Sequence, residues 1–396
     1  MTSSNATLVL WMKSWGDSDA EMLVSGAHDA NTLDLIERSQ DVSEIGRVIV
    51  VGDSPRLTKL LRGLPVTLET DPHLTSPPFG QRLRSIIQKY AVGNLLYLGG
   101  GSGVFMDVED MARLAQAALA FPETLWVNNF YSTDFAAFRT ASLLDELARC
   151  RRDNHLGWIL GRDTGMKARV LPPSLTSRFD IDTPVDLMVL KAHQKTPGHH
   201  LAEFLAQLTF DLSPLFKVTD ALVHRESRIL IIGRVPLQIA AFFDKATACH
   251  VNFHIEGRGM DAREEAETIH PWSLVGKSLE TMGLREFFHA LSREAQAMIM
   301  DSRVCFRHLG IDATRRDRFF SDLLRPDQVQ EPFVRRFTRH ARQSPVPCIL
   351  GGHTLVSGGL YALAELAWSR TKNSLRPGME DIPHDSWKGT YGGGMG

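Results

Sequence analysis

The chain has 396 residues, of which 43% are hydrophobic and 23% charged, a globular composition sufficient for two or three domains. Its formal net charge of −2 excludes a global attraction to nucleic acid or to an anionic membrane. No stretch reaches the roughly 18 apolar residues of a membrane-spanning helix, and the N-terminus does not look like a secretory signal. The four scattered cysteines favour reduced thiols over a disulfide framework or a metal site. We therefore expect a cytoplasmic protein without nucleic-acid or membrane partners, and leave a homo-oligomer open.

In the first half, short apolar runs alternate with amphipathic stretches, which is typical of an α/β domain with a parallel sheet. Strands are predicted at residues 8–12, 48–51, 66–68, 94–98 and 125–128, with a further candidate at 170–171. A helix capped by Ser54 and begun by Pro55 is predicted after the second strand. The fourth strand ends in a glycine turn (residues 99–103), and Asp107 is expected to cap the helix that follows.

A polar segment at residues 194–200, with Pro197 and Gly198, suggests a domain boundary. We predict a first domain at residues 1–195, a second α/β domain at 201–370 and a flexible tail, rich in glycine and proline, at 371–396. In the second domain, strands are predicted at 229–232, 249–255, 304–306 and 346–350. Helices are predicted at 201–212, 236–246, 284–297, 331–342 and 354–368.

One motif in the first half carries a family resemblance. The sequence SRFDIDTPVDLMVL, with Asp180, Asp182 and Asp186, resembles the closing motif of small nucleotidyltransferases, including guanylyltransferases of molybdenum-cofactor and phospholactate metabolism. Upstream, FGQRL followed by LLYLGGGSGVF resembles a related glycosyltransferase-like group, and the order of the segments also fits. The resemblance covers roughly residues 5–195. It implies a GT-A or nucleotidyltransferase-like (Rossmann-like) domain, with a mostly parallel sheet flanked by helices, that binds a nucleotide or sugar nucleotide.

The same resemblance implies a magnesium site. In such families, carboxylates at the ends of neighbouring strands hold Mg²⁺, so Asp180 and Asp182 become candidate metal ligands and Asp182 a catalytic residue. Two features depart from the pattern. The segment KSWGDSDAE after the first strand has no GxGxR phosphate loop, and the glycine turn stands where an aspartate is expected. Asp134 and Asp153 are the candidate replacements.

Several other polar residues are candidates for ligand binding. Backbone amides of the glycine turn could cradle a phosphate or a sugar, although the turn could equally be structural. Two polar segments, VNNFYSTDF (residues 127–135) and RDNHLGW (residues 152–158), lie where this fold usually binds its acceptor substrate or the nucleotide base. Alternatively, Ser132 and Thr133 cap a helix that starts near Asp134. The candidates in the first half are Gly99, Gly100, Gly101, Ser102, Asn128, Asn129, Ser132, Asn154 and Trp158.

The second half offers helix N-termini suited to anions. Arg234 follows a strand, Arg258 lies in GRGMDARE, and LGGHTLVSGG brings Gly352, His353 and Thr354 to a predicted helix start. Close packing of helix on sheet is the alternative for those glycines. Between residues 315 and 339, arginines interleaved with phenylalanines could bind single-stranded nucleic acid. Acidic residues dilute the charge and the phenylalanines fall at helical spacing, so we expect helices whose arginines face solvent and whose phenylalanines form a stripe in the core. The segments 301–303 and 321–322 are polar without an assigned role.

Three functions remain open from these residues. The first is a magnesium-dependent nucleotidyltransferase or glycosyltransferase-like enzyme. The second is a degenerate transferase fold kept as a binding or scaffold subunit. The third places the chemistry in the second half, around Arg234, Arg258 and His353.

Overall fold

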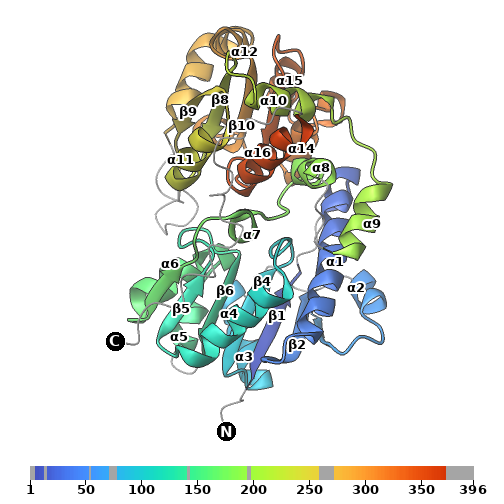
Figure 1. The fold of residues 1–396 in the computed structure, drawn as a ribbon, viewed down its shortest axis with the longest axis vertical. Helices are drawn as coiled ribbons and strands as arrows, with labels where there is room; N and C mark the ends of the chain where they lie inside the picture. The colour runs from blue at the N-terminus through green and yellow to red at the C-terminus, as the bar shows by residue number, and fades with distance from the viewer. Residues whose placement is uncertain are drawn as a thin grey trace.

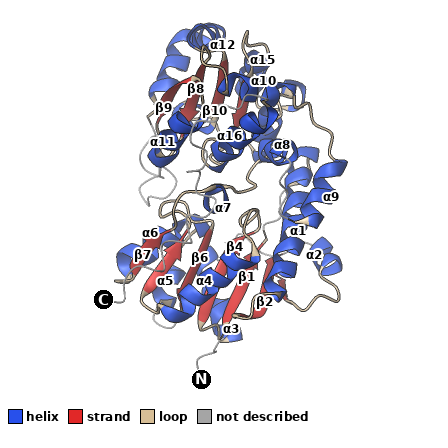
Figure 2. Cartoon of the chain, in the orientation of Figure 1, coloured by secondary structure: helices blue, strands red, loops and turns tan. Residues whose placement is uncertain are grey.

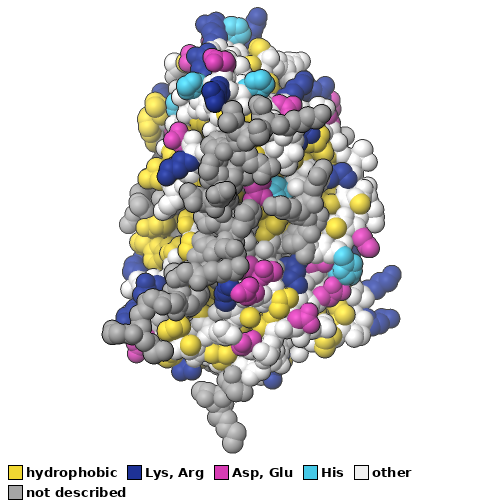
Figure 3. Space-filling view, in the orientation of Figure 1, with side chains coloured by type: hydrophobic (Ala, Val, Ile, Leu, Met, Phe, Trp, Pro, Cys, Tyr) yellow, Lys and Arg dark blue, Asp and Glu magenta, His cyan; other side chains and the backbone are white. Residues whose placement is uncertain are grey.

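The computed structural model describes residues 5–12, 16–52, 55–70, 78–140, 143–193, 198–257 and 272–371. Figure 1 shows two layered α/β units, one above the other, each built on its own sheet. Within the described residues, no helix combines the length and the apolar character needed to cross a membrane. The face drawn in Figure 3 carries basic and acidic side chains interspersed, as the near-zero net charge leads one to expect.

The first unit is a seven-stranded sheet in the order β3-β2-β1-β4-β6-β5-β7. All neighbouring strands are parallel except β6, which runs antiparallel to both β4 and β5. The mixed, mostly parallel sheet confirms the predicted fold class. The strands are β1 (Ala6–Trp11), β2 (Ile45–Gly52), β3 (Thr67–Thr70), β4 (Asn94–Gly99), β5 (Thr124–Val127), β6 (Phe135–Arg139) and β7 (Lys167–Val170).

Helices cover both faces of this sheet, because its central strands are apolar on both sides and need two cores. One core joins the sheet to α3, α5 and α6, and the other joins it to α2, α4 and the C-terminal part of α1. The bounds are α1 (Asp19–Gln40), α2 (Pro55–Leu60), α3 (Phe79–Tyr90), α4 (Val108–Ala120), α5 (Leu144–Ala148) and α6 (Leu156–Asp163).

The second unit is a four-stranded parallel sheet in the order β11-β10-β8-β9. Its strands are β8 (Arg228–Gly233), β9 (His250–Ile255), β10 (Ala297–Asp301) and β11 (Cys348–Gly351). The surrounding helices are α10 (Ser213–Leu222), α11 (Leu237–Ala246), α12 (Leu274–Glu294), α13 (Arg303–His308), α14 (Arg315–Asp322), α15 (Pro332–Arg342) and α16 (Gly358–Arg370).

Three helices connect the two units. After the short helix α7 (Leu175–Arg178), helix α8 (Pro184–His193) is buried nearly all round and packs into the core of the second sheet. The N-terminal part of α1 joins the same core through Ala20 and Val24, whereas Leu35 and Ile36 belong to the first sheet's core. Helix α9 (His199–Gln207) lies along α1, as Figure 1 shows.

One alternative offered for the first half and one local prediction for the second are wrong. Residues 135–139 form strand β6 and not a helix, because the run FAAFR pairs between β4 and β5. Residues 304–306 lie in helix α13, and the strand of that region is β10, whose five residues are all buried. The expected helix cap Ser54, the boundary residues 194–197, Arg258 and the tail from residue 372 lie outside the described residues.

Candidate functional site

The carboxyl ends of both sheets face a shared cavity of about 670 Å³. From the first sheet it is lined by Trp11 at the end of β1 and by the glycine turn after β4. From the second it is lined by Arg234, Arg303 and His353, which follow β8, β10 and β11. Figure 2 shows the two sets of strands pointing toward the space near α7. Ligands of α/β proteins commonly bind at this edge of the sheet, so the cavity is the candidate site.

The glycine turn packs directly against the DIDTP segment. The amide of Ile181 donates a 3.0 Å hydrogen bond to the carbonyl of Gly101. A Cβ atom on Gly101 would lie 2.6 Å from the backbone carbonyl oxygen of Ile181, so this approach requires glycine. His28 from α1 supports the same turn, its Nε2 lying 2.7 Å from the carbonyl of Ile181. The two segments that carry the resemblance therefore meet at the cavity, with Asp180 and Asp182 both lining it.

Asp134 lies beside the glycine turn because β6 is antiparallel to β4. The register that pairs Leu98 with Phe135 brings the start of β6 to the end of β4, and the Gly99 amide donates to the Asp134 carbonyl at 2.9 Å. The Asn128 side chain donates to Oδ2 of Asp134 at 2.7 Å and accepts the Asp134 amide at 2.9 Å. Burial and the nearby charge of Asp182 raise the pKa of Asp134 to about 7.

The DIDTP turn is fixed by a buried carboxylate. Oδ2 of Asp186 accepts hydrogen bonds from the amides of Asp182 and Thr183, at 3.0 and 2.7 Å, and from the Thr183 hydroxyl at 2.9 Å. Oδ2 of Asp182 in turn accepts a 3.0 Å bond from the hydroxyl of Thr354 in the second unit. Thr354 therefore positions Asp182 without being among the residues that line the cavity.

Two buried ion pairs support the opposite wall. Nε of Arg234 lies 2.6 Å from Oδ2 of Asp301, and Arg303 binds Asp322 through two contacts of 2.5 and 2.6 Å. Burial alone would raise the pKa of Asp301, but the guanidinium of Arg234 outweighs it and the pKa is lowered. Gly233 permits the first pair, because its φ is +129° and a Cβ there would lie 2.5 Å from the Asp301 Cβ.

Three further arginines of the second unit line the cavity: Arg307 of α13, and Arg315 and Arg318 of α14. Burial and the charge of Arg303 lower the pKa of Arg318 to about 10, so it remains protonated at neutral pH at an energetic cost. The core stripe expected here exists, since Phe319, Phe320 and Phe337 are buried. The expected solvated face is wrong for Arg315 and Arg318, which face the cavity.

His353 is held in its neutral form. Burial and the charge of Arg234 lower its pKa to about 4, although Asp301 and Asp182 act in the opposite direction. A Cβ on Gly351 would approach Val185 to 2.8 Å, so close packing accounts for that glycine. A neutral imidazole with a pKa this low is a weak base at pH 7 and offers mainly hydrogen bonding.

The structure separates the predicted site residues into three groups. Those that line the cavity are Gly99, Gly100, Gly101, Asn129, Ser132, Asp134, Asp153, Asn154, Asp180, Asp182, Arg234, Gly352 and His353. Four do not. Ser102 donates to the Gly99 carbonyl, Asn128 holds Asp134, Trp158 stacks on Tyr131 with ring centroids 5.6 Å apart, and Thr354 binds Asp182. Arg258 lies outside the described residues.

Sequence reasoning missed part of the lining. The missed residues include Trp11, His28, Arg152, Arg178, Arg307, Arg315 and Arg318. The unassigned polar segments at 301–303 and 321–322 held a usable signal, since they supply both aspartates of the buried pairs. Nothing local marks His28, which lies in the middle of α1.

The carboxylates of this wall are hard oxygen donors, which suits Mg²⁺. Burial and the charge of Asp182 raise the pKa of Asp134, and a divalent cation bound beside both carboxylates would offset their repulsion. Among the described residues, no group of three or more His, Cys, Asp or Glu side chains at the cavity brings its ligand atoms within 4.8 Å of one another; the group that does, two aspartate or glutamate and two histidine side chains, lies at α1 and α9. The fit is therefore to an ion held by one or two carboxylates and completed by phosphate oxygens and water.

Comparisons with known proteins bear on the fold of the first half. A scan against protein-family models gives no match, and a search of curated proteins finds no significant one. Among solved structures, a cytidylyltransferase from Leptospira borgpetersenii serovar Hardjo-bovis (strain JB197) has 16% identity and a TM-score of 0.39, covering 52% of this chain and 99% of its own. A CMP:2-keto-3-deoxy-manno-octonic acid synthetase complexed with CTP has 15% identity and a TM-score of 0.36, covering 52% and 100%.

A 4-diphosphocytidyl-2C-methyl-D-erythritol synthase is more distant, with 10% identity and a TM-score of 0.35 over 47% of this chain and 97% of its own. Each of these solved structures aligns with about half of this chain, and none of them reaches a TM-score of 0.5. At these identities the likeness concerns fold alone.

Proposed function

We propose that the cavity binds the magnesium complex of a nucleotide or sugar nucleotide and that the protein transfers its nucleotidyl or glycosyl group. One observation carries the proposal. All four aspartates that line the cavity come from the first unit, and five of the seven lining arginines come from the second. Among the described residues, a cation-binding wall therefore faces an anion-binding wall, which matches the charges of a metal–polyphosphate complex.

The second unit would supply the phosphate contacts that the loop after β1 does not supply. The resembled families use a glycine-rich loop with a basic residue, and no such pattern follows β1. Arg234 and Arg303 are oriented by buried aspartates, so their guanidinium groups are ordered before a ligand arrives. The cost of keeping Arg318 charged would fall when an anion binds beside it.

Asp182 and Asp134 would hold Mg²⁺, with Asp180 beside them. The bound ion would neutralise charge on the phosphoryl group under attack. Asn129, Ser132 and Asn154 line the same cavity and offer hydrogen bonds to sugar hydroxyls or a base. Catalysis by these residues consists of positioning and charge neutralisation, without a covalent intermediate on the protein.

A second candidate is a binding subunit with the same ligand and no transfer. The glycine turn favours it, because glycine stands where the resembled families carry an aspartate. Placing the chemistry in the second unit around His353 is less favoured, because its pKa of about 4 makes it a poor general base at neutral pH.

A ligand-binding screen separates these functions. We expect nucleoside triphosphates or sugar nucleotides to stabilise the protein only with Mg²⁺, by about 2.7 kcal/mol at 100 times the dissociation constant. Asp182→Asn should abolish the stabilisation that the nucleotide gives in the presence of Mg²⁺. Arg318→Gln should weaken nucleotide binding at least tenfold. Asp244→Asn and Arg62→Gln change exposed residues of the same types and should bind as the wild type does.

Transfer is then assayed with the nucleotide that binds, as release of pyrophosphate or of nucleoside diphosphate. Magnesium-dependent binding without turnover across a panel of phosphorylated and hydroxylated acceptors supports the binding subunit. Binding that ignores Mg²⁺ and survives Asp182→Asn would contradict both functions.

A further inference from the structure

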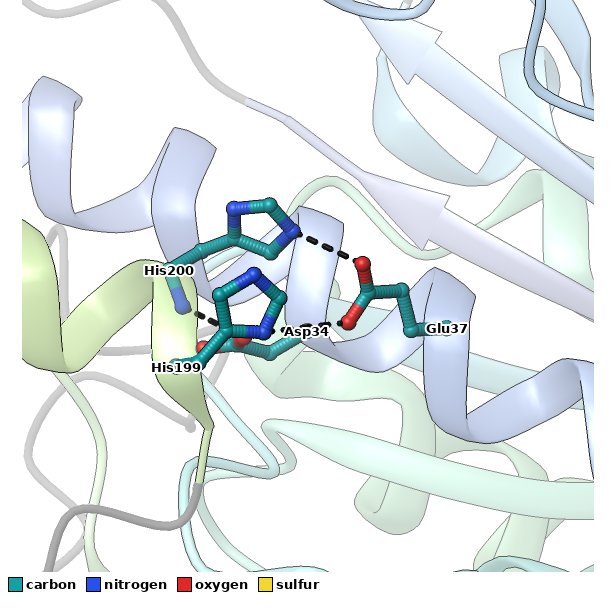
Figure 4. A group of neighbouring side chains, drawn as sticks. All are labelled: Asp34, Glu37, His199 and His200. Carbon is teal, nitrogen blue, oxygen red and sulfur yellow. Dashed lines mark hydrogen bonds and ion pairs between the residues drawn. The ribbon is translucent and has the colours of Figure 1, made fainter.

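A second cluster of metal-ligating side chains lies away from the cavity, where α9 packs on α1. His199 and His200 are the first two residues of α9, and Asp34 and Glu37 lie one turn apart on α1. One ligand atom from each of the four comes within 4.8 Å of the others. Figure 4 shows the two imidazole rings and the carboxylate of Glu37 turned toward one another, with Asp34 next to His199.

Glu37 joins the two histidines. Its Oε1 lies 2.9 Å from Nε2 of His200, and its Oε2 lies 3.4 Å from Nδ1 of His199. The two ring centroids are only 3.8 Å apart. Glu37 and His199 are about half exposed, at 49% and 60% of their side-chain surface, so an ion can reach them from solvent.

Helix capping explains only one member of this cluster. The two carboxylate oxygens of Asp34 accept the amides of His200 and Leu201, both at 3.0 Å, and the residue is 2% exposed. These bonds fix the carboxylate but leave lone pairs on each oxygen. Gly198 packs closely against the Asp34 carboxylate, since a Cβ atom on Gly198 would lie 2.0 Å from the Cγ atom of Asp34. Capping gives no reason for two adjacent imidazoles to converge on Glu37.

We propose that Asp34, Glu37, His199 and His200 form a zinc-binding site that fastens α9 to α1. Two imidazole nitrogens and two carboxylate oxygens from two chain segments are a four-ligand set that Zn²⁺ accepts with tetrahedral geometry. Imidazole ligands favour Zn²⁺ over Mg²⁺ or Ca²⁺, which prefer oxygen. The backbone bonds to Asp34 act as the outer contacts that orient a metal ligand.

The site's position gives it a structural role. Helix α1 contributes to the cores of both sheets, and α9 packs against α1 and α8. A metal ion there would fix the position of α9 on α1. It lies outside the cavity lining, so it is independent of the proposed nucleotide site.

The test uses the full-length protein with no affinity tag, stripped of metal with a chelator. Zn²⁺ is titrated in competition with a chromophoric chelator, and Co²⁺ absorption reports tetrahedral coordination. We expect one equivalent of zinc and a rise in Tm of roughly 2–4 °C at saturation. Glu37→Gln and the double variant His199→Gln/His200→Gln should each weaken zinc binding by more than tenfold and lose the shift in Tm. Asp34 is left unchanged because it caps α9.

His224→Gln, at an exposed histidine of the second unit, is the matched control and should bind zinc as the wild type does. Nucleotide binding by Glu37→Gln should also match the wild type. The proposal is overturned if the wild type binds less than half an equivalent of zinc, or if zinc binds equally well to the Glu37 and histidine variants.

Discussion

The cavity has an acidic wall on the first unit and a basic wall on the second, and the two differ in how their charges are balanced. The acidic wall consists of Asp134, Asp153, Asp180 and Asp182, and the basic wall of Arg234, Arg303, Arg307, Arg315 and Arg318. On the second unit's wall, Arg234 and Arg303 each meet a fully buried aspartate of their own unit. On the first unit's wall, Asp134 is instead buried beside the like charge of Asp182, and both effects raise its pKa to about 7. The charges of Arg234 and Arg303 are thus balanced within the protein. Asp134 and Asp182 gain most from a cation brought by the ligand, and Arg318, whose pKa is lowered, gains from the ligand's anion. Charge balance, more than charge type, distinguishes the two.

The largest expected effect comes from breaking the balance of the basic wall. Asp322→Ala would leave the charge of Arg303 buried, with 14% of its side chain exposed, and should lower the free energy of unfolding by about 3–5 kcal/mol. Urea denaturation measures this loss. The double variant Arg303→Met/Asp322→Leu removes both charges and should lose less than Asp322→Ala alone. A loss below about 1 kcal/mol for the single variant would show that the pair is not buried in solution.

The acidic wall should respond to pH in the opposite sense to an ordinary paired carboxylate. An unfolded aspartate releases its proton near pH 4, whereas folded Asp134 holds it to about pH 7. Between these values the folded state binds more protons, so the free energy of unfolding falls as pH rises, by up to about 4 kcal/mol.

Asp134→Asn removes this group and should flatten that part of the pH profile, as measured by urea denaturation at several pH values. Asp244→Asn, at an exposed aspartate, should leave the slope unchanged. An identical slope in wild type and Asp134→Asn would mean that the Asp134 carboxyl ionises normally. In that case the acidic wall is no less balanced than the basic one.

The sequence predicted the first sheet well, because its strands are short apolar runs bounded by glycine and polar residues. It failed where one run admits two structures. FAAFR lacks the polar alternation of a half-buried strand, since both faces of β6 are covered, and nothing local distinguishes it from a helix. The apolar run at residues 304–306 is likewise too short to separate strand from helix. In both cases pairing with distant strands decides the outcome.

The site could be predicted only as far as its local motifs extend. DIDTP and the glycine turn could be identified from short patterns, and they meet at the cavity. The arginine wall could not be predicted, because Arg234, Arg303 and Arg318 come from three elements that only the second sheet brings together. That the two units share one cavity depends on α1, which is buried along most of its length, and on α8, which is buried nearly all round, so neither gives a clear amphipathic signal.

The smallest expected effect tests which acid belongs to the acidic wall. Asp107 is the acidic residue nearest to the glycine turn in sequence, yet its side chain caps α4, accepting the Asp110 amide at 2.8 Å. Asp107→Ala should therefore lower the free energy of unfolding by about 1 kcal/mol and leave magnesium-dependent nucleotide binding intact. Asp134→Asn should do the reverse, weakening binding while sparing the helix. If Asp107→Ala weakened binding as much as Asp134→Asn, the carboxylate that replaces the missing aspartate would lie at the start of α4, and the antiparallel pairing of β6 would have no part in building the site.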